Sequence, residues 1–138
     1  MISSNLPASN QNFKQFSEQE KKKELNRLIS SLSNSQRQYQ QQKNDKNLHH
    51  LIDSLVSIDL TLLDFINHYN LNPAQYADKT FKYPLIDLYS VKLFDNIENQ
   101  EEFHKNICLC YNIIVDHFNN LQEHTNIIFE SFSKKIAE

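Results

Sequence analysis

Histidine is the residue type in this sequence best suited to metal or acid–base chemistry, and the chain has six. A helical bundle builds a metal site from histidines and carboxylates that are three or four residues apart on facing helices. Asp64 and His68 have this spacing, and His117 and His124 lie two turns apart, each directly after a carboxylate. A metal or small-ligand site at these four residues is therefore an alternative. We expect partly solvated surface histidines and no cofactor.

The other reactive residue types give little support for catalysis. Asp53, Asp59 and Asp64 share one predicted helix, but their spacing does not bring two carboxylates together in a cleft. Cys110 falls on the predicted core face, which favours an unreactive thiol, whereas Cys108 lies off that face. The two side chains point about 200° apart on a helix, a poor geometry for a disulfide or a shared metal. We expect reduced thiols, a cytoplasmic location and no enzymatic activity.

The chain contains no glycine among its 138 residues. Glycine supplies backbone at positive φ and allows close approach of the backbone to a ligand. Its absence excludes Gly-rich phosphate loops, the dinucleotide-binding fingerprint and the usual nucleophile elbow. Turns in this protein must instead be made by Asn, Pro and Ser.

Length and hydrophobicity fit one small domain. Hydrophobic residues make up 39 % of the chain, which is enough for a lean core. There is no apolar run long enough to cross a membrane, and the first residues lack the basic start and apolar run of a secretory signal. Residues 1–16 are polar and contain Pro7, so we predict a flexible lead-in there. Residues 17–138 are expected to form a single helical-bundle domain.

The spacing of apolar residues predicts an all-α, four-helix-bundle-like fold. The first helix begins after Ser17, which makes the pattern of a capping box with Glu20. A second helix over about residues 47–70 is central, because its apolar residues alternate steps of three and four through three heptads. Those residues are Leu48, Leu51, Leu55, Ile58, Leu62, Phe65 and Tyr69. Asn70 follows them in the place where a left-handed cap usually has glycine.

Two further helices are predicted after a short helical turn at residues 72–75. One runs from Pro84 to Ile97. The other is a long C-terminal helix over about residues 100–136, whose apolar residues recur every ~3.67 residues, as in a nearly straight helix. It would be about 55 Å long, and the pair Asn119–Asn120 is its weakest point and the place where it would bend. The third helix cannot cover that length alone, so the excess must pack on the first two helices or on another subunit.

Charge is distributed unevenly along the chain. Residues 1–46 hold eight Lys and Arg against four Asp and Glu, and residues 47–138 hold six against thirteen. A basic first helix carrying Lys21, Lys22, Lys23 and Arg27 offers an alternative function, a contact with nucleic acid phosphates. There is no helix-turn-helix signature and only two arginines, so nucleic acid is the less favoured partner. The acidic remainder would suit a basic protein.

Aromatic residues outside the main apolar stripes are the candidate partner-binding residues, because aromatic side chains are enriched at interaction hot spots. They are Phe13, Phe16, Tyr39, Tyr76, Phe81 and Tyr83. The alternative is that they close the ends of the bundle. The sequence thus predicts a non-enzymatic helical protein that acts by protein–protein contact, as an immunity or inhibitor protein, a secretion or assembly chaperone, or a regulatory adaptor. Its partner is expected to be another, basic protein or a second copy forming a homodimer.

Overall fold

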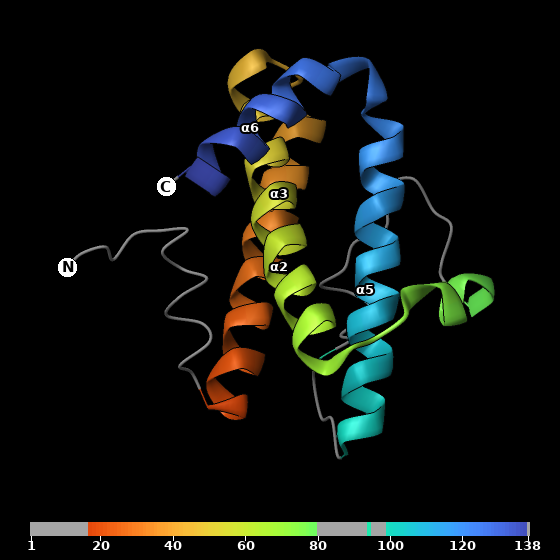
Figure 1. Ribbon diagram of the computed structural model, residues 1–138. Helices are drawn as coiled ribbons and strands as arrows, with labels where there is room; N and C mark the ends of the chain where they lie inside the picture. Colours follow the sequence, from red (N-terminus) through yellow and green to blue (C-terminus); the bar gives the residue numbers. More distant parts are fainter. Residues whose placement is uncertain (1–16, 80–93, 95–98, 138) are drawn as a thin grey trace.

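The computed structural model describes residues 17–79, 94 and 99–137, and this part of the chain is all-α (Figure 1). It contains α2 (Glu18–Gln41), α3 (Asp45–Tyr69), α5 (Gln100–Asn120) and α6 (Thr125–Ala137), with two short 3₁₀ helices, η1 (Pro73–Lys79) and η2 (Gln122–His124). The predicted helical-bundle fold is confirmed, and no strand occurs in these ranges. The predicted lead-in and all of the helix predicted at Pro84–Ile97 except Phe94 lie outside the described residues.

The first two helices form a hairpin whose ends are closed by side chains. The predicted capping box is present, because the Glu20 amide donates to the Ser17 hydroxyl and the Ser17 amide donates to the Glu20 carboxylate. At the other end of α2, the side-chain amide of Asn47 donates to the carbonyls of Gln38 and Gln42, at 3.3 and 2.8 Å. This amide ties the first turn of α3 to the last turn of α2.

Asn70 ends α3 in the left-handed conformation, as predicted, with φ 53° and ψ 50°. Asparagine is one of the few residues other than glycine that enters this region at low cost. The amide of Leu71 then donates to the Ile66 carbonyl at 2.9 Å, which satisfies an end carbonyl of the helix. Asn72 starts η1 by accepting from the Ala74 amide at 3.2 Å, so the predicted helical turn is confirmed too.

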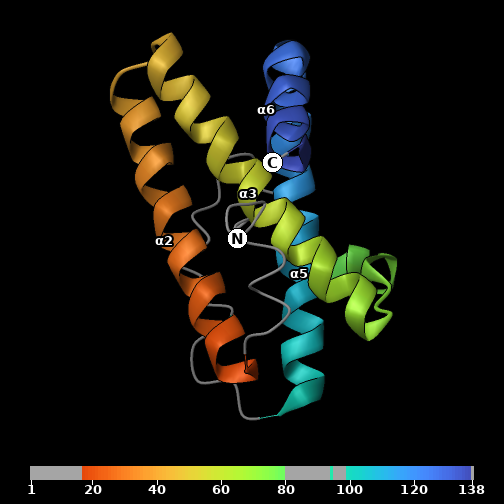
Figure 2. The same cartoon turned by 60° about the vertical axis from the view of Figure 1, so that its left-hand side comes forward.

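The apolar stripe of α3 lies at the centre of the described molecule. α3 contacts α2, α5 and α6, and Figure 2 shows it between α2 and α6. Phe65 meets Phe103 of α5 edge to face, with ring centroids 5.3 Å apart, and Phe94 packs on the same ring at 6.0 Å. The fully buried side chains of this core include Leu25, Leu32, Leu55, Ile58, Leu62, Phe65, Phe103, Ile107, Ile113 and Ile114.

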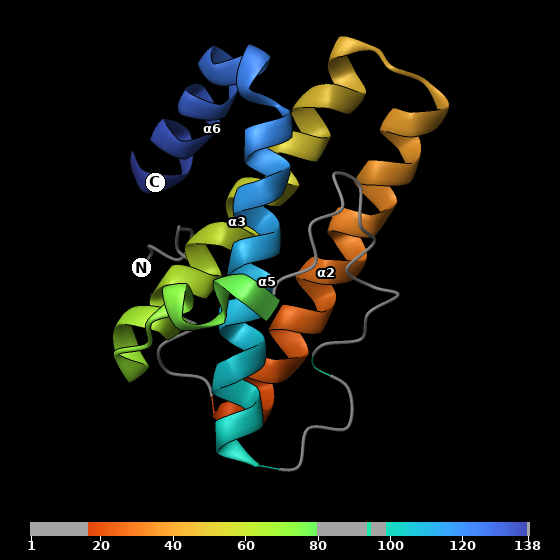
Figure 3. The same cartoon turned by 90° about the vertical axis from the view of Figure 1, so that its right-hand side faces the viewer.

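The helix predicted over residues 100–136 is divided in two, and the division comes directly after Asn119–Asn120, its predicted weakest point. α5 ends at Asn120, and the chain turns back through η2 before α6 begins at Thr125 (Figure 3). Asparagine is a poor helix former, and the Asn120 side-chain amide donates to the Asp116 carbonyl at 3.0 Å, a local bond that competes with the helix. The turn lets α6 pack on α3, which is one of the two destinations predicted for the excess apolar length.

Candidate functional site

The outer side of α6 carries the apolar residues that stand out on this molecule. Among the described residues, the large hydrophobic side chains with high exposure are Phe129, 72 % exposed, and Ile136, 66 % exposed. They are seven residues apart, which is two helical turns, so they lie on one side of α6. We refer to this pair as the α6 apolar pair. Single exposed hydrophobics are common, but two large ones aligned on one helix form a small contact surface.

α6 packs on α3, and this packing sets the orientation in which α6 holds the apolar pair. Ile128 and Phe132 pack against Leu48, Ile52 and Val56, three residues of α3 that are buried beneath them. We call these three residues the α6 seat. α6 therefore packs on α3 through Ile128 and Phe132 and leaves Phe129 and Ile136 exposed beside that packed side.

One hydrogen bond and one ring contact also hold α6 in place. The hydroxyl of Ser131, a buried residue, donates to Oδ1 of Asp53 on α3 at 2.6 Å. The ring of Phe132 lies 5.7 Å from that of Phe118 on α5. Contacts to two different helices hold α6 in one orientation, which reduces the entropy that a partner would have to remove on binding.

The surroundings of the apolar pair are polar and carry both charges. Glu130 and Lys134 lie between Phe129 and Ile136 in the sequence and form an exposed ion pair at 3.6 Å. Such a surface pair adds little to stability. Apolar anchors beside charged residues are the usual arrangement of a protein interface, in which the anchors supply affinity and the charged rim supplies selectivity.

The structure places two of the aromatic residues predicted to bind a partner, and it places them against the core. Tyr39 and Tyr76 are half-buried and pack against core residues, Tyr39 at the α2–α3 end and Tyr76 in η1. Their rings therefore contribute to the fold, which is the alternative given above for these aromatics. The other four candidates, Phe13, Phe16, Phe81 and Tyr83, lie outside the described residues.

The four residues considered for a metal are not brought together. His117 is buried on α5, with its ring nitrogen 3.5 Å from the side-chain nitrogen of Gln36 on α2. His68 is exposed and packs edge to face on Tyr69, and His124 lies beside Glu123 in η2. Across the described residues, no group of three or more His, Cys, Asp or Glu side chains is arranged to hold a metal ion.

The basic residues of the first helix are largely engaged within the molecule. The Lys21 ammonium lies 5.8 Å from the Phe65 ring centre, and that of Lys22 lies 5.0 Å from the Phe103 ring centre. Cation–π contacts of this kind cover the end of the apolar core. Arg27 donates twice to the Glu24 carboxylate, at 2.8 and 2.6 Å. Lys23 and Arg27 are exposed.

Both cysteines are buried, which corrects the expectation for Cys108. Its side chain is 1 % exposed, and burial raises the pKa of its thiol. η1 packs on α5 near this residue. Asn112, one turn beyond Cys108, donates to the Pro73 carbonyl of η1 at 3.1 Å. Burial also raises the pKa of the Cys110 thiol, so neither cysteine has the exposed thiolate that nucleophilic chemistry requires.

Asp59 is a buried carboxyl group that the sequence did not mark as unusual. It lies on α3, is 6 % exposed, and makes no hydrogen bond or ion pair within the described residues. Its charge acts on Cys110 and Tyr111 of α5, whose pKa values it raises further. Burial raises the pKa of Asp59 to about 6, because a carboxylate is poorly solvated there. A single carboxyl group without an oriented partner does not make a catalytic site.

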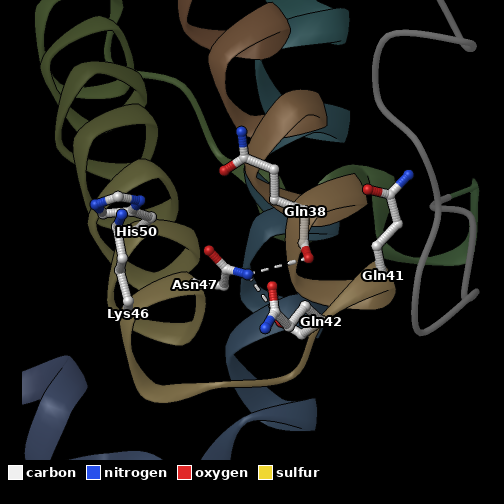
Figure 4. A pocket seen from close by; sticks show the side chains of 6 residues that line it. All are labelled: Gln38, Gln41, Gln42, Lys46, Asn47 and His50. Atoms are coloured by element: carbon white, nitrogen blue, oxygen red, sulfur yellow. Dashed lines mark hydrogen bonds between the residues drawn. The ribbon is translucent and has the colours of Figure 1, made fainter.

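A polar hollow opens beside the turn between α2 and α3, with a volume of about 550 Å³ (Figure 4). Side chains from both helices line it: Gln38, Gln41, Gln42, Lys46, Asn47 and His50. Apart from Asn47, which bonds the two glutamine carbonyls, these side chains are exposed. The lining can hydrogen bond a small polar molecule, but it contains no carboxylate, thiol or hydroxyl to carry out catalysis.

Comparison with known proteins adds no function. No protein-family model matches this chain, and no curated protein or solved structure matches it significantly. The described helices also include none that is long and apolar enough to cross a membrane. The function must therefore be inferred from the residues and their arrangement.

Proposed function

We propose that this protein is a non-enzymatic helical module that binds another protein through the α6 apolar pair. The single observation that supports this is the exposure of Phe129 and Ile136 on a helix whose other side is packed and hydrogen bonded to α3. An aromatic and an aliphatic side chain held rigidly in solvent can enter a groove on a partner with little loss of entropy.

The roles that fit such a module are those of an immunity or inhibitor protein, a secretion or assembly chaperone, or a regulatory adaptor. Each acts by covering or connecting another protein. The net charge of −3 favours a basic partner through electrostatic complementarity. Both cysteines are buried, and Asp59 has no hydrogen-bond partner within the described residues, which supports binding rather than catalysis as the function.

The test compares proteins captured from native lysate by three tagged forms of the chain. The wild type is compared with the double variant Phe129→Ser/Ile136→Ser and with a matched control, Lys23→Ser/Gln40→Ser, which changes two exposed residues of α2. We expect one specific partner that the wild type and the control recover and the α6 variant loses. A wild type that captures nothing, or a partner retained by the α6 variant, would contradict the proposal.

A further inference from the structure

The segment between α5 and α6 contains no residue that forces the chain to bend. Residues 119–125 include neither proline nor glycine. Leu121 departs from helical geometry, with φ −112° and ψ 19°, whereas Thr125 is already helical at φ −54° and ψ −37°. Rotations of about 50° in φ and about 60° in ψ would return Leu121 to the α-helix. The hydrogen bonds of η2 differ from α-helical bonds by only one residue.

The apolar pattern of the sequence also fits a straight helix through this point. From Phe103 through Phe118 and Leu121 to Ile128 and Phe132, apolar residues recur about every 3.6 residues, with Thr125 as the one polar residue in the series. In the bent form this stripe is divided, since its α5 part faces the main core and its α6 part covers α3. A continuous helix would keep the stripe on one side and extend α6 about 20 Å beyond α5.

The α6 seat forms a separate apolar cluster from the main core. Leu48, Ile52 and Val56 are buried with Ile128 and Phe132, while the other α3 core residues pack with α2 and α5. If α6 left, these three side chains would lose the cover of Ile128 and Phe132 and keep only that of neighbours such as Tyr39 and Phe118, so they would again bind an apolar helix. The surface that fits them best is the one that covers them in this structure, with Ser131 placed to donate to Asp53.

We propose that α6 exchanges between two copies of this chain, so that the α6 of each copy occupies the α6 seat of the other while α5 and α6 form one continuous helix. The contacts made by Ile128, Ser131 and Phe132 are the same in both forms. The equilibrium between the monomer and the exchanged dimer therefore depends on the free energy of the bend at Leu121 and on the protein concentration. The α6 apolar pair takes no part in these contacts, so this inference does not depend on the proposed partner surface.

The test joins α3 to α6 by a short bismaleimide crosslinker in the full chain carrying Asp53→Cys and Ser131→Cys. The hydroxyl and the carboxylate are 2.6 Å apart, and the native cysteines are buried and should react little. The protein is refolded at micromolar and at millimolar concentration and separated by size before crosslinking. We expect a dimer fraction at the higher concentration whose crosslinks join two chains, and a monomer fraction whose crosslinks stay within one.

Two hinge variants provide matched controls for the exchange. His124→Ala/Thr125→Ala favours the straight helix and should raise the dimer fraction several-fold, because it removes the bond from the Thr125 hydroxyl to the Gln122 carbonyl and puts alanine at residue 124, which is α-helical only in the straight form. Gln122→Pro, at the first residue of η2, should abolish the dimer, since proline cannot continue a helix from α5. The proposal is overturned if the alanine variant stays monomeric at millimolar concentration. It is equally overturned if its dimer crosslinks only within chains.

Discussion

The buried carboxyl group of Asp59 lowers the stability of the fold when it is ionised. Its carboxyl group lies between α3 and α5 with no hydrogen bond or cation within the described residues. The pKa of about 6 is above the ordinary value of 3.8, so the folded protein keeps a proton that the unfolded chain releases in this range. The contribution of Asp59 to stability is therefore most favourable below about pH 4, falls as the pH rises from about 4 to about 6, and stays lower above that.

The residue-level prediction follows from this pH dependence. Asp59→Asn keeps the shape and removes the buried charge, so it should raise the free energy of unfolding by about 1–3 kcal/mol at pH 7.5. At pH 4 the two proteins should differ much less. Urea denaturation at both pH values measures this. Glu130→Gln, at an exposed position, is the control. If Asp59→Asn changes the free energy of unfolding at pH 7.5 no more than this control does, the Asp59 carboxylate is not destabilising.

The elements differ in how they are held. α2, α3 and α5 share the main core, while α6 depends on the α6 seat, the ring of Phe118 and the Ser131–Asp53 bond. Phe132 and Phe129 stand on the same helix and have opposite roles, since Phe132 is half-buried against α3 and Phe129 faces solvent. They allow the fold and the proposed surface to be tested separately.

Phe132→Ala should destabilise the attachment of α6. The loss of ring contacts in a half-buried position predicts a decrease of about 1–3 kcal/mol in the free energy of unfolding. Hydrogen exchange should show faster exchange across α6 before α3 or α5 is affected. Phe129→Ala should change stability by less than about 0.5 kcal/mol. Equal effects of the two substitutions would contradict the orientation of α6.

The left-handed cap at the end of α3 also contributes to stability. Asn70 holds a positive φ, where alanine is disfavoured by its Cβ atom. Asn70→Ala should therefore lower the free energy of unfolding by about 1 kcal/mol, while Asn70→Gly should be neutral or slightly stabilising. Thermal and urea denaturation of the two variants measure the difference. An alanine variant as stable as the glycine variant would mean that the cap geometry contributes little.

At the scale of the whole molecule, features with a strong local signal could be predicted from the sequence. The heptad pattern of α3, the cap at Ser17 and the left-handed Asn70 each depend on residues close in the chain. The sequence also marked Asn119–Asn120 as the weakest point of the last helix, and the bend follows it directly. The reversal of direction at Leu121 could not be predicted, because the packing of α6 on α3 decides it. The exposure of Phe129 follows from that packing, so it could not be predicted either. Cys108 was misplaced for a similar reason, since η1 covers it from outside its own helix.

The central claim is that this small helical protein binds a partner through α6. The most direct measurement is the affinity of the purified partner for the wild type and for Phe129→Ser/Ile136→Ser, by calorimetry at equal ionic strength. Two anchors at the centre of an interface predict that the dissociation constant rises by about thirtyfold or more, because each anchor is worth at least about 1 kcal/mol. A change of less than about twofold would contradict the account.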